Sequence, residues 1–397
     1  MAMGETHNIR VKLFIPTLIL AIFLVNTFSF SISVALLDVA KSFDISAGTA
    51  SQLFNVNRFA GLITGLIMSA LTVRFKLKSL LLVGVGIYGI GLVGSSLSID
   101  FTTMMFFQFF LGMGGPAVII LVYALIGENL PLQKRGWAVG LMWSTAFVTS
   151  VIAYLLAGVV VQTFGWRQLL LLIYFPISIV TLILSFLVIS SKSFQEQTPV
   201  KSEFKRALKE LLSTKSTIGC LAAVTSVFFL STATYYVPSF LRTQFSISVA
   251  EAGTYAAMVG ATGIFGALIV GKLINRIGRR PIAIWMALIA GTSTMILALM
   301  PNIFTSAAIW GISMLSVSMV ETTLYSLALE QSSTYRSSMM SINQSFRYLG
   351  TVIGLSLGGF VLNFFGNNYP LLLGIFGISG IICAAFVLLL AKEPCKV

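Results

Sequence analysis

Charged side chains are scarce in this 397-residue chain, where Asp, Glu, Lys and Arg together make up 9% of the residues. Soluble domains carry about 25% charged residues. The shortage of charge, with a hydrophobic fraction of 57% and a mean hydropathy of +0.97, therefore excludes a soluble globular protein. We expect a multi-pass protein of the cytoplasmic membrane of the cell.

Residues that carry chemistry are equally few. The single histidine, His7, lies in the N-terminal tail, and no two carboxylates share the interior of an apolar run. An enzyme inside the membrane needs a nucleophile with its base, or metal ligands. The three cysteines show neither a disulfide framework nor metal-ligand spacing. We therefore expect no enzyme, no metal site and no cofactor.

Apolar runs of helical length are abundant instead. A membrane-spanning helix needs roughly 20 such residues. Runs of this kind lie near residues 13–35, 49–72, 79–98, 102–127, 137–162, 168–190, 217–240, 249–271, 281–300, 303–328, 337–363 and 369–391. The sequence therefore predicts an all-α integral membrane protein with about twelve transmembrane helices.

The longest charged interruption, residues 191–216, divides these runs into two sets of six. We expect an N-terminal six-helix bundle over residues 1–190, a cytoplasmic linker, and a C-terminal six-helix bundle over residues 217–397. Within the linker, the segment from Glu203 to Leu212 has two interpretations. It is either a solvated connection or a short amphipathic helix on the membrane surface.

Basic residues are distributed unevenly between the two sides of the membrane. With alternating spans, 20 Lys and Arg fall on the side of both termini, and only Lys41, Arg167 and Arg242 fall on the other. Cytoplasmic loops carry the excess of positive charge, so this count places both termini in the cytoplasm. It also accounts for the net charge of +13 without any nucleic-acid partner.

The two halves repeat each other weakly. The second run ends in SALTVRFKLKSLL and the eighth in GKLINRIGRRPIA, at the same place in each half. The loops after the fourth and tenth runs join Glu128 to Arg135 and Glu330 to Arg336. Two related six-helix halves are typical of secondary transporters that bind their substrate near the middle of the membrane.

The segment Gly271–Arg280, GKLINRIGRR, resembles the loop signature G-x-x-x-(D/N)-R-x-G-R-(R/K) of the major facilitator superfamily. Because it lacks G-x-x-x-x-G-K-(S/T), it is not a phosphate-binding loop. The resemblance covers the whole chain and is greatest to twelve-helix drug and metabolite efflux carriers. It implies two pseudo-symmetric bundles that alternate their access. It also implies a gating role for Gly271, Asn275, Arg276, Gly278 and Arg280, with Glu128–Arg135 and Glu330–Arg336 as latch pairs.

Departures from the family pattern weaken one part of this expectation. The first-half copy of the loop has Ser69, Val73 and Lys76 where the signature has Gly, an acid and Gly. Gln108 replaces the arginine that is associated with proton coupling in the family's R-x-x-x-G-x-G pattern. Tyr154 occupies the place of the proline in the antiporter pattern G-P-x-x-G-G. Proton-driven antiport therefore loses two of its supporting motifs.

Glu321 is the one acidic residue deep inside an apolar run, with Met314, Ser318 and Tyr325 at helical spacing on its face. An ionisable group there is a functional candidate by default. The carboxylate has three candidate roles. It could bind and release a proton, attract a cationic substrate together with aromatic rings, or pair with an arginine as a structural ion pair.

Two arginines also lie in the middle of apolar runs: Arg58, one turn after Asn55, and Arg347, one turn after Asn343. A guanidinium offers a fork of donors suited to carboxylate or phosphate. Two embedded arginines against one embedded glutamate leave one positive charge, which indicates an anionic or zwitterionic substrate. The alternative is that one or both arginines pair with Glu321. Gly350, Gly354 and Gly358 continue the Arg347 stripe as a predicted helix-packing face.

Gln108, Asn26, Tyr236 and Tyr325 complete the candidate binding residues, each with packing as the alternative role. We predict a monomeric secondary transporter in the lipid bilayer. It would move a small amphipathic or charged organic solute by alternating access, as an exporter with protons as the candidate coupling ion. One alternative is an organic-anion importer or exchanger that uses Arg58 and Arg347. A more remote one is a non-transporting membrane receptor or scaffold.

Overall fold

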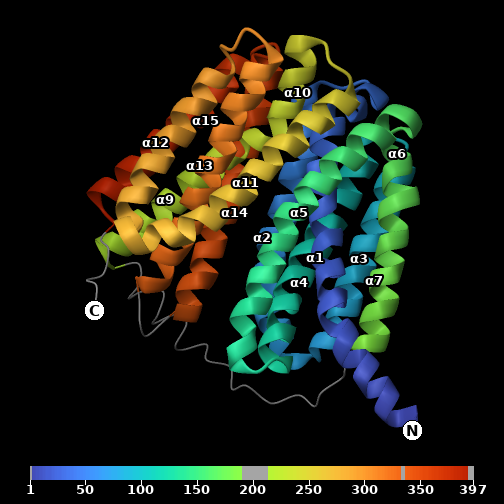
Figure 1. The fold of residues 1–397 in the computed structure, drawn as a ribbon. Helices are drawn as coiled ribbons and strands as arrows, with labels where there is room; N and C mark the ends of the chain where they lie inside the picture. The colour runs from blue at the N-terminus through green and yellow to red at the C-terminus, as the bar shows by residue number, and fades with distance from the viewer. Residues whose placement is uncertain (1, 190–212, 332–335, 392–397) are drawn as a thin grey trace. The chain divides into compact units, whose positions relative to one another are not determined.

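A computed structural model describes residues 2–189, 213–331 and 336–391, and this part of the chain is all-helical (Figure 1). The helices are α1 (Ala2–Ser42), α2 (Ala47–Arg74), α3 (Leu77–Leu97), α4 (Phe101–Asn129), α5 (Leu132–Phe164), α6 (Trp166–Gln168), the π-helix η1 (Leu169–Tyr174), α7 (Phe175–Val188), α9 (Lys215–Ser231), α10 (Ala233–Phe245), α11 (Val249–Ile277), α12 (Arg279–Leu297), α13 (Ile303–Glu330), α14 (Arg336–Phe364) and α15 (Tyr369–Leu389). The short helix expected from Glu203 to Leu212 lies outside the described residues.

Eleven helical segments of the described chain are long and apolar enough to cross a membrane, judged by length and composition. Two of them combine several elements: Trp166–Val188 contains α6, η1 and α7, and Lys215–Phe245 contains α9 and α10. Together with α2, these segments occupy all twelve places where apolar runs predicted a span. The prediction of the fold class is therefore confirmed.

The described helices form two compact units. Unit 1 contains Met1–Asp44 and Val56–Thr198, and unit 2 contains Ile45–Asn55 and Pro199–Val397. The start of α2 thus belongs to unit 2, where Asn55 Nδ2 donates to Ser356 Oγ at 2.7 Å. The rest of α2 belongs to unit 1, where Gly112 of α4 lies so close to the Asn57 carbonyl oxygen that a Cβ would be 2.2 Å from it.

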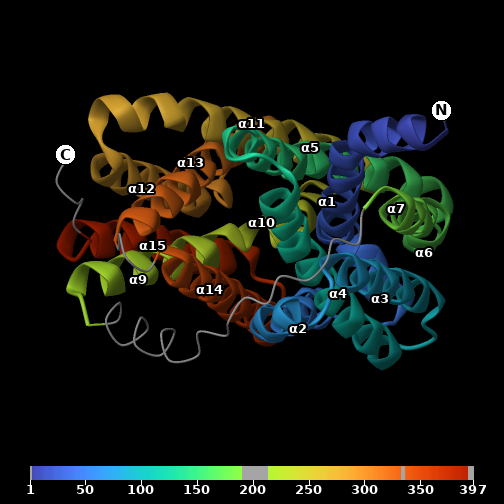
Figure 2. The same ribbon diagram turned by 90° about the horizontal axis from the view of Figure 1, so that it is seen from below.

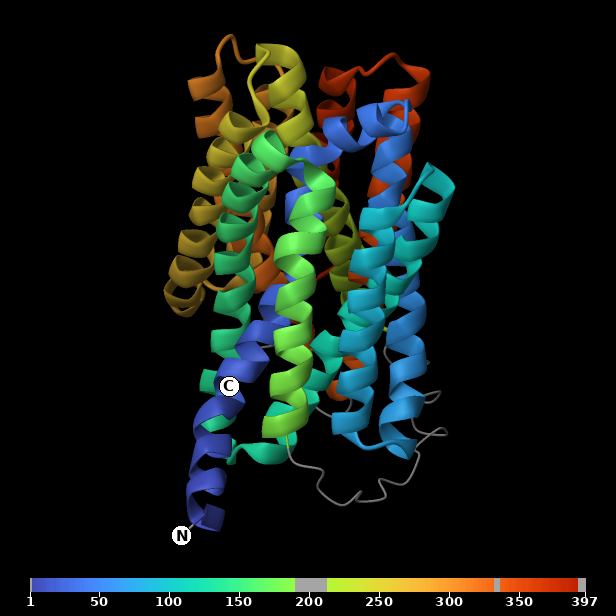
Figure 3. The same ribbon diagram turned by 90° about the vertical axis from the view of Figure 1, so that its right-hand side faces the viewer.

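Unit 1 is built around two sets of contacts: α1 packs on α4, α5 and α7, and α3 packs on α4 and α7. Figure 3 views this unit from the side of α3 and the bright-green α7. In unit 2, α9 packs on α13, α14 and α15, and α12 packs on α13 and α15 (Figure 2). Cys220 and Cys383 are free thiols buried in the core of unit 2, and Cys395 lies outside the described residues.

Helix ends follow from local chemistry. Asp100 caps the N-terminus of α4, and its carboxylate accepts hydrogen bonds from the backbone N–H of Thr103 at 2.8 Å and from the Thr103 hydroxyl at 2.9 Å. These bonds lower the pKa of Asp100. Gly165 (φ +91°) ends α5 and Gly278 (φ +95°) ends α11, in conformations that a side chain disfavours. Each glycine turns the chain sharply into the next helix.

Two spans contain interruptions that the hydropathy pattern did not predict. In η1 the N–H of Phe175 bonds to the Leu170 carbonyl, five residues back, and Pro176, which has no N–H, follows at once. Between α9 and α10, the Ser231 hydroxyl bonds to the Val227 carbonyl and the Thr232 hydroxyl to the Phe229 carbonyl. Such side-chain bonds compete with the backbone ladder and bend helices.

Candidate functional site

Glu321 lies well inside α13, nine residues before the helix ends at Glu330. Its Oε1 accepts a hydrogen bond from the Ser231 hydroxyl at 2.6 Å. Ser231 is the last residue of α9, at the interruption between α9 and α10. Broken helices of this kind line substrate and ion sites in many transporters. The carboxylate is therefore held at a bend inside a membrane span.

Arg347 of α14 belongs to the same cluster. Its guanidinium carbon lies 4.3 Å from the centre of the Phe228 ring, and its Nη1 donates to Gln344 Oε1 at 3.1 Å. Arg347 and Glu321 also interact electrostatically. We define Phe228, Ser231, Glu321 and Arg347 as the Glu321 cluster. It joins α9, α13 and α14 of unit 2, and Glu321 and Arg347 are both partly exposed.

Asn343 lies one turn before Arg347 and is 1% exposed. Neither its Oδ1 nor its Nδ2 has a hydrogen-bond partner among the residues that the structure describes. Leaving a buried amide unsatisfied costs about 1–3 kcal/mol. A water molecule or a polar group of a ligand would satisfy such a group.

The remaining residues of the expected Glu321 face point in different directions. Met314 Sδ accepts a hydrogen bond from Thr234 of α10 at 3.3 Å. The Ser318 hydroxyl donates to the Gly263 carbonyl of α11 at 2.7 Å, so this side chain serves helix packing. Tyr325 is 37% exposed. Through Thr234, Met314 contacts the helix that continues from Ser231.

Arg58 has a different set of neighbours in unit 1. Its Nη2 donates to the Ser29 hydroxyl of α1 at 3.3 Å. It also interacts electrostatically with Tyr88 of α3, whose hydroxyl donates to the Leu24 carbonyl at 3.2 Å. Arg58 belongs to unit 1, whereas Glu321 and Arg347 belong to unit 2.

Four other candidates make contacts of their own. Gln108 is fully buried and its Nε2 donates to Ser95 Oγ at 3.1 Å, which ties α4 to α3. Tyr236 is also fully buried, and its hydroxyl donates to the Leu355 carbonyl at 3.0 Å. Asn26 donates to the Ile22 carbonyl of its own helix, and Asn55 donates to Gln52 and Ser356. The hydrogen bonds of Gln108 and Tyr236 thus tie neighbouring helices together, and their role in binding stays a prediction.

The glycine stripe of α14 packs closely against α9 and α10. A Cβ at Gly350 would be 2.2 Å from the Thr225 carbonyl oxygen, and at Gly354 it would be 2.5 Å from the Thr232 hydroxyl. At Gly358 it would be 2.5 Å from the Tyr236 ring. The prediction that this stripe is a packing face is confirmed, and the stripe begins one turn after Arg347.

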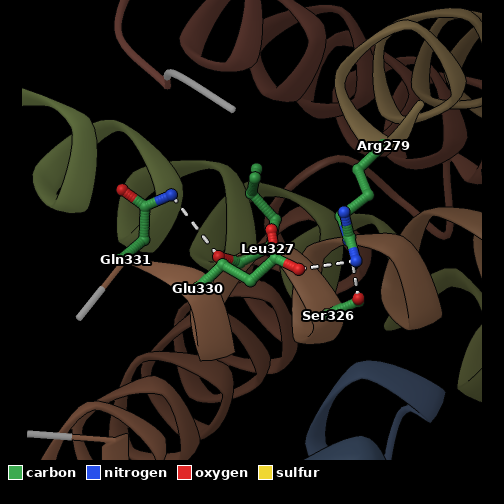
Figure 4. Close-up of polar contacts among 5 residues, drawn as sticks. All are labelled: Arg279, Ser326, Leu327, Glu330 and Gln331. Carbon is green, nitrogen blue, oxygen red and sulfur yellow. Dashed lines mark hydrogen bonds and ion pairs between the residues drawn. The ribbon is translucent and has the colours of Figure 1, made fainter. Parts of the chain in front are cut away.

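The start of α12 and the end of α13 form a second polar cluster, shown in Figure 4. Arg279 Nη2 forms an ion pair with Glu330 Oε1 at 2.6 Å, and its Nε donates to Ser326 Oγ at 2.9 Å. Gln331 extends the cluster, because its Nε2 donates to the Leu327 carbonyl and its Oε1 accepts from Ser216 of α9. Sequence reasoning missed Arg279, although it stands between Gly278 and Arg280 in the signature.

Other expected gating residues have varied surroundings. Arg280 donates from Nε to the Val387 carbonyl at 3.3 Å and from Nη2 to that of Leu388, near the end of α15, where backbone carbonyls lack helical partners. Arg135 Nε donates to the Leu130 carbonyl at 2.9 Å. Gly271 has open space around it, and Arg276 and Glu128 are exposed. The side chains of Asn275 and Arg336 lie outside the described part of the chain.

Among the described residues, no group of three or more His, Cys, Asp or Glu could hold a metal ion. The polar groups well inside the described spans include hydroxyls, amides, the Glu321 carboxylate, and the guanidinium groups of Arg58 and Arg347. Such a set can hold a polar solute or exchange a proton, which is the chemistry of binding and transport.

Solved structures share this fold. A bacterial homologue of the human lysosomal transporter Spinster, in an inward-facing and occupied conformation, matches with a TM-score of 0.81, 17% identity, and coverage of 94% of this chain and 95% of that one. The inward-open xylose transporter XylE from E. coli matches with a TM-score of 0.78, 16% identity, and coverage of 96% of each chain.

A curated relative, the multidrug resistance protein MdtG of Proteus mirabilis (strain HI4320), is 24% identical over 253 residues. The match spans 61% of this chain and 61% of that relative. The family model of the Major Facilitator Superfamily matches residues 18–350, which is most of the sequence. The chain therefore belongs to the Major Facilitator Superfamily and is a membrane transporter, not an enzyme.

Proposed function

We propose that this transporter exports a small amphipathic organic solute across the cell membrane in exchange for protons, with Glu321 as the proton-carrying residue. The observation that carries the proposal is the position of the Glu321 carboxylate. It lies inside a span, accepts a 2.6 Å hydrogen bond from Ser231, and interacts electrostatically with Arg347. No other acidic residue lies deep inside an apolar run of the sequence.

The chemistry of the Glu321 cluster suits a reversible change of charge. An apolar environment favours a neutral carboxyl group, whereas a nearby positive charge favours the ionised form. Arg347 supplies a fixed positive charge beside Glu321, and Ser231 supplies a hydroxyl that hydrogen-bonds either form. A solute that enters between Glu321 and Arg347 alters this balance, so that its binding and proton binding become linked.

Export is supported by the similarity to MdtG, which is named as a multidrug resistance protein. The excess of Lys and Arg on one side of the expected spans supports a cytoplasmic location of both termini. A proton gradient directed inward would then drive an amphipathic solute outward through the alternating access that two six-helix bundles provide.

The experiment is solute flux in sealed proteoliposomes with an imposed pH gradient, run against a panel of cationic, anionic and neutral amphipathic solutes. The proposal requires at least one solute whose flux follows the gradient in the unsubstituted protein. Glu321→Gln, which keeps the size of the side chain and one acceptor oxygen but cannot ionise, is expected to abolish that dependence.

The matched control is Glu251→Gln in the same unit. Glu251 occupies the third helical position of a capping box with Ser248, where glutamine serves as well as glutamate. The control is expected to keep gradient-driven flux. A Glu321→Gln protein that still couples flux to the pH gradient would contradict the proposal.

An organic-anion importer or exchanger is the second candidate. It is favoured by the mid-span guanidinium groups of Arg58, which donates to Ser29, and Arg347, which lies over Phe228. A fork of donors in such a place suits a carboxylate or phosphate. If Arg58→Ala and Arg347→Ala leave transport intact while Glu321→Gln abolishes it, the anion interpretation fails.

A further inference from the structure

Unit 1 carries an apolar cavity of about 600 Å³ between α3, α4 and α7 that the proposed transport site does not use. Gly86 of α3 lines it, and a Cβ at this position would meet nothing within 4 Å, so this glycine leaves space open in the cavity. Ser178 is its one polar lining side chain, and the Ser178 hydroxyl is already bonded to the Phe175 carbonyl of its own helix. An occupant of this cavity therefore needs to be apolar.

The cavity opens on the outer surface of unit 1. Ile90 of α3 and Ile179 of α7 line it and are 55% and 42% exposed. In a membrane-spanning helix bundle, exposed isoleucine and an adjoining apolar groove face lipid tails. We call this feature the α3–α7 groove.

The length of the groove corresponds to one leaflet of a bilayer. Its lining on α3 runs from Val85 to Leu97, which lie twelve residues apart and so roughly 18 Å apart along the helix. Half of a hydrocarbon core of about 30 Å is about 15 Å. Leu97 is also the last residue of α3, so the groove begins near the middle of the membrane and ends at its surface. A lipid acyl chain spans the same interval.

A basic group stands at the surface end of the groove. Arg167 Nη2 donates to the carbonyl of Ser98, the residue after Leu97, at 2.7 Å. Its guanidinium also lies over the rings of Trp166 at 4.4 Å and Phe43 at 5.1 Å, and it stays partly exposed. Asp100 lies nearby in sequence, but its carboxylate is bonded to Thr103 at the start of α4. Arginine, with five N–H donors, keeps capacity for a phosphate.

From these observations we infer that the α3–α7 groove binds one acyl chain of an anionic phospholipid whose phosphate lies at Arg167. The bound lipid fills the space beside Gly86 and anchors unit 1 in the leaflet that contains the α3–α4 connection. This site is independent of the Glu321 cluster, and it adds a specific lipid to the partners of the protein.

The test uses the full chain in phosphatidylcholine vesicles with a minor fraction of phosphatidylglycerol. A phosphatidylglycerol analogue with a photoactivatable group on its acyl chain is added, and the labelled peptides are identified by mass spectrometry. Labelling is expected on the α3 and α7 peptides that line the groove.

Gly86→Phe is the groove-filling variant, because Gly86 lines the groove and a Cβ at this position meets nothing within 4 Å. Gly65→Phe on α2 is its matched control, since Gly65 is equally open and does not line the groove. Gly86→Phe is expected to lower labelling several-fold, Gly86→Leu to lower it less, and Gly65→Phe to leave it unchanged.

The headgroup is tested at Arg167. Arg167→Gln is expected to lower phosphatidylglycerol labelling about five-fold, the factor equivalent to roughly 1 kcal/mol for one arginine near a membrane surface. Arg167→Lys is expected to retain most of it. Equal labelling of Gly86→Phe and Gly65→Phe, crosslinking of a second copy of the chain in the groove, or equal labelling by a phosphatidylcholine analogue would each overturn the inference.

Discussion

The two embedded arginines differ in what surrounds them. Arg347 in unit 2 interacts with a carboxylate, Glu321, and lies over an aromatic ring, Phe228. Arg58 in unit 1 donates to a hydroxyl, Ser29, and interacts with the phenol Tyr88. Each unit thus has one mid-span guanidinium, on α2 in unit 1 and on α14 in unit 2, and the two have different electrostatic surroundings. We expect Glu321 and Arg347 to function as a coupled pair and Arg58 to have a separate role.

The largest expected effect comes from breaking the Glu321–Arg347 interaction. Glu321→Gln is expected to lower gradient-driven flux by roughly tenfold or more, equivalent to about 1.4 kcal/mol. It also leaves Arg347 without this negative neighbour. Removing one partner of a buried charge pair costs about 3–5 kcal/mol, whereas removing both is often neutral, so for these partly exposed groups we expect a loss on the order of 2 kcal/mol.

The double variant Glu321→Gln/Arg347→Gln is expected to regain that stability in a thermal unfolding measurement without regaining flux. If the double variant unfolds at a lower temperature than Glu321→Gln alone, the two residues are not a coupled pair.

The next largest loss of stability is expected when the closely packed glycines near each arginine are replaced. Gly350, three residues after Arg347, faces the Thr225 carbonyl, and Gly112 faces the carbonyl of Asn57, next to Arg58. Alanine at either position forces helices apart, and overpacking of this kind costs about 1–3 kcal/mol. Thermal unfolding of Gly350→Ala and Gly112→Ala checks this, with Gly374→Ala as the control because it has open space. Unfolding temperatures equal to that of the control would show that the helices shift freely.

Smaller losses of stability are expected when the two serines that contact the embedded charges are replaced, and the loss should be larger for Ser231 than for Ser29. Ser231 donates to Glu321 at 2.6 Å, whereas Ser29 accepts from Arg58 at the longer distance of 3.3 Å. Hydrogen bonds to charged groups contribute about 1.5–3 kcal/mol, and shorter ones are stronger. We therefore expect Ser231→Ala to lower the free energy of unfolding by about 1.5–3 kcal/mol and Ser29→Ala to lower it by about 1 kcal/mol. Chemical denaturation of both variants measures this order, and the reverse order would contradict the difference between the two surroundings.

The smallest effect is expected at the Arg279–Glu330 ion pair, whose side chains are 26% and 34% exposed. Exposed pairs contribute about 0–1 kcal/mol and are screened by salt. Glu330→Gln is therefore expected to lower the unfolding temperature slightly at low salt and not at high salt. A loss of stability that persists at high salt would show that the pair is more strongly shielded than its exposure indicates.

The membrane fold followed directly from the sequence because a span requires a long apolar run, and each of the twelve runs became helical. The breaks inside two spans did not follow, since hydropathy does not distinguish a bent helix from a straight one. The signals were present in the adjacent hydroxyls of Ser231 and Thr232, and in Pro176 after η1.

The sequence predicted the charged residues of the candidate site but not the neighbours that contact them. Glu321, Arg58 and Arg347 stand out because charges are rare inside apolar runs. Ser231 and Phe228 do not, because serine and phenylalanine are common there and only the packing of α9 on α13 and α14 brings them to those charges. Arg279 was missed for a related reason. Its partner, Glu330, lies 51 residues further along the chain, whereas the sequence analysis paired Glu330 with the nearby Arg336.

Proton release on solute binding tests the central claim, that Glu321 exchanges a proton for the solute, most directly. The purified protein in weakly buffered detergent solution is mixed with a transported solute, and the pH change is recorded for the unsubstituted chain, Glu321→Gln and Glu251→Gln. The account predicts proton release by the unsubstituted chain and by Glu251→Gln, and none by Glu321→Gln. Undiminished release by a Glu321→Gln protein that still binds the solute would contradict it.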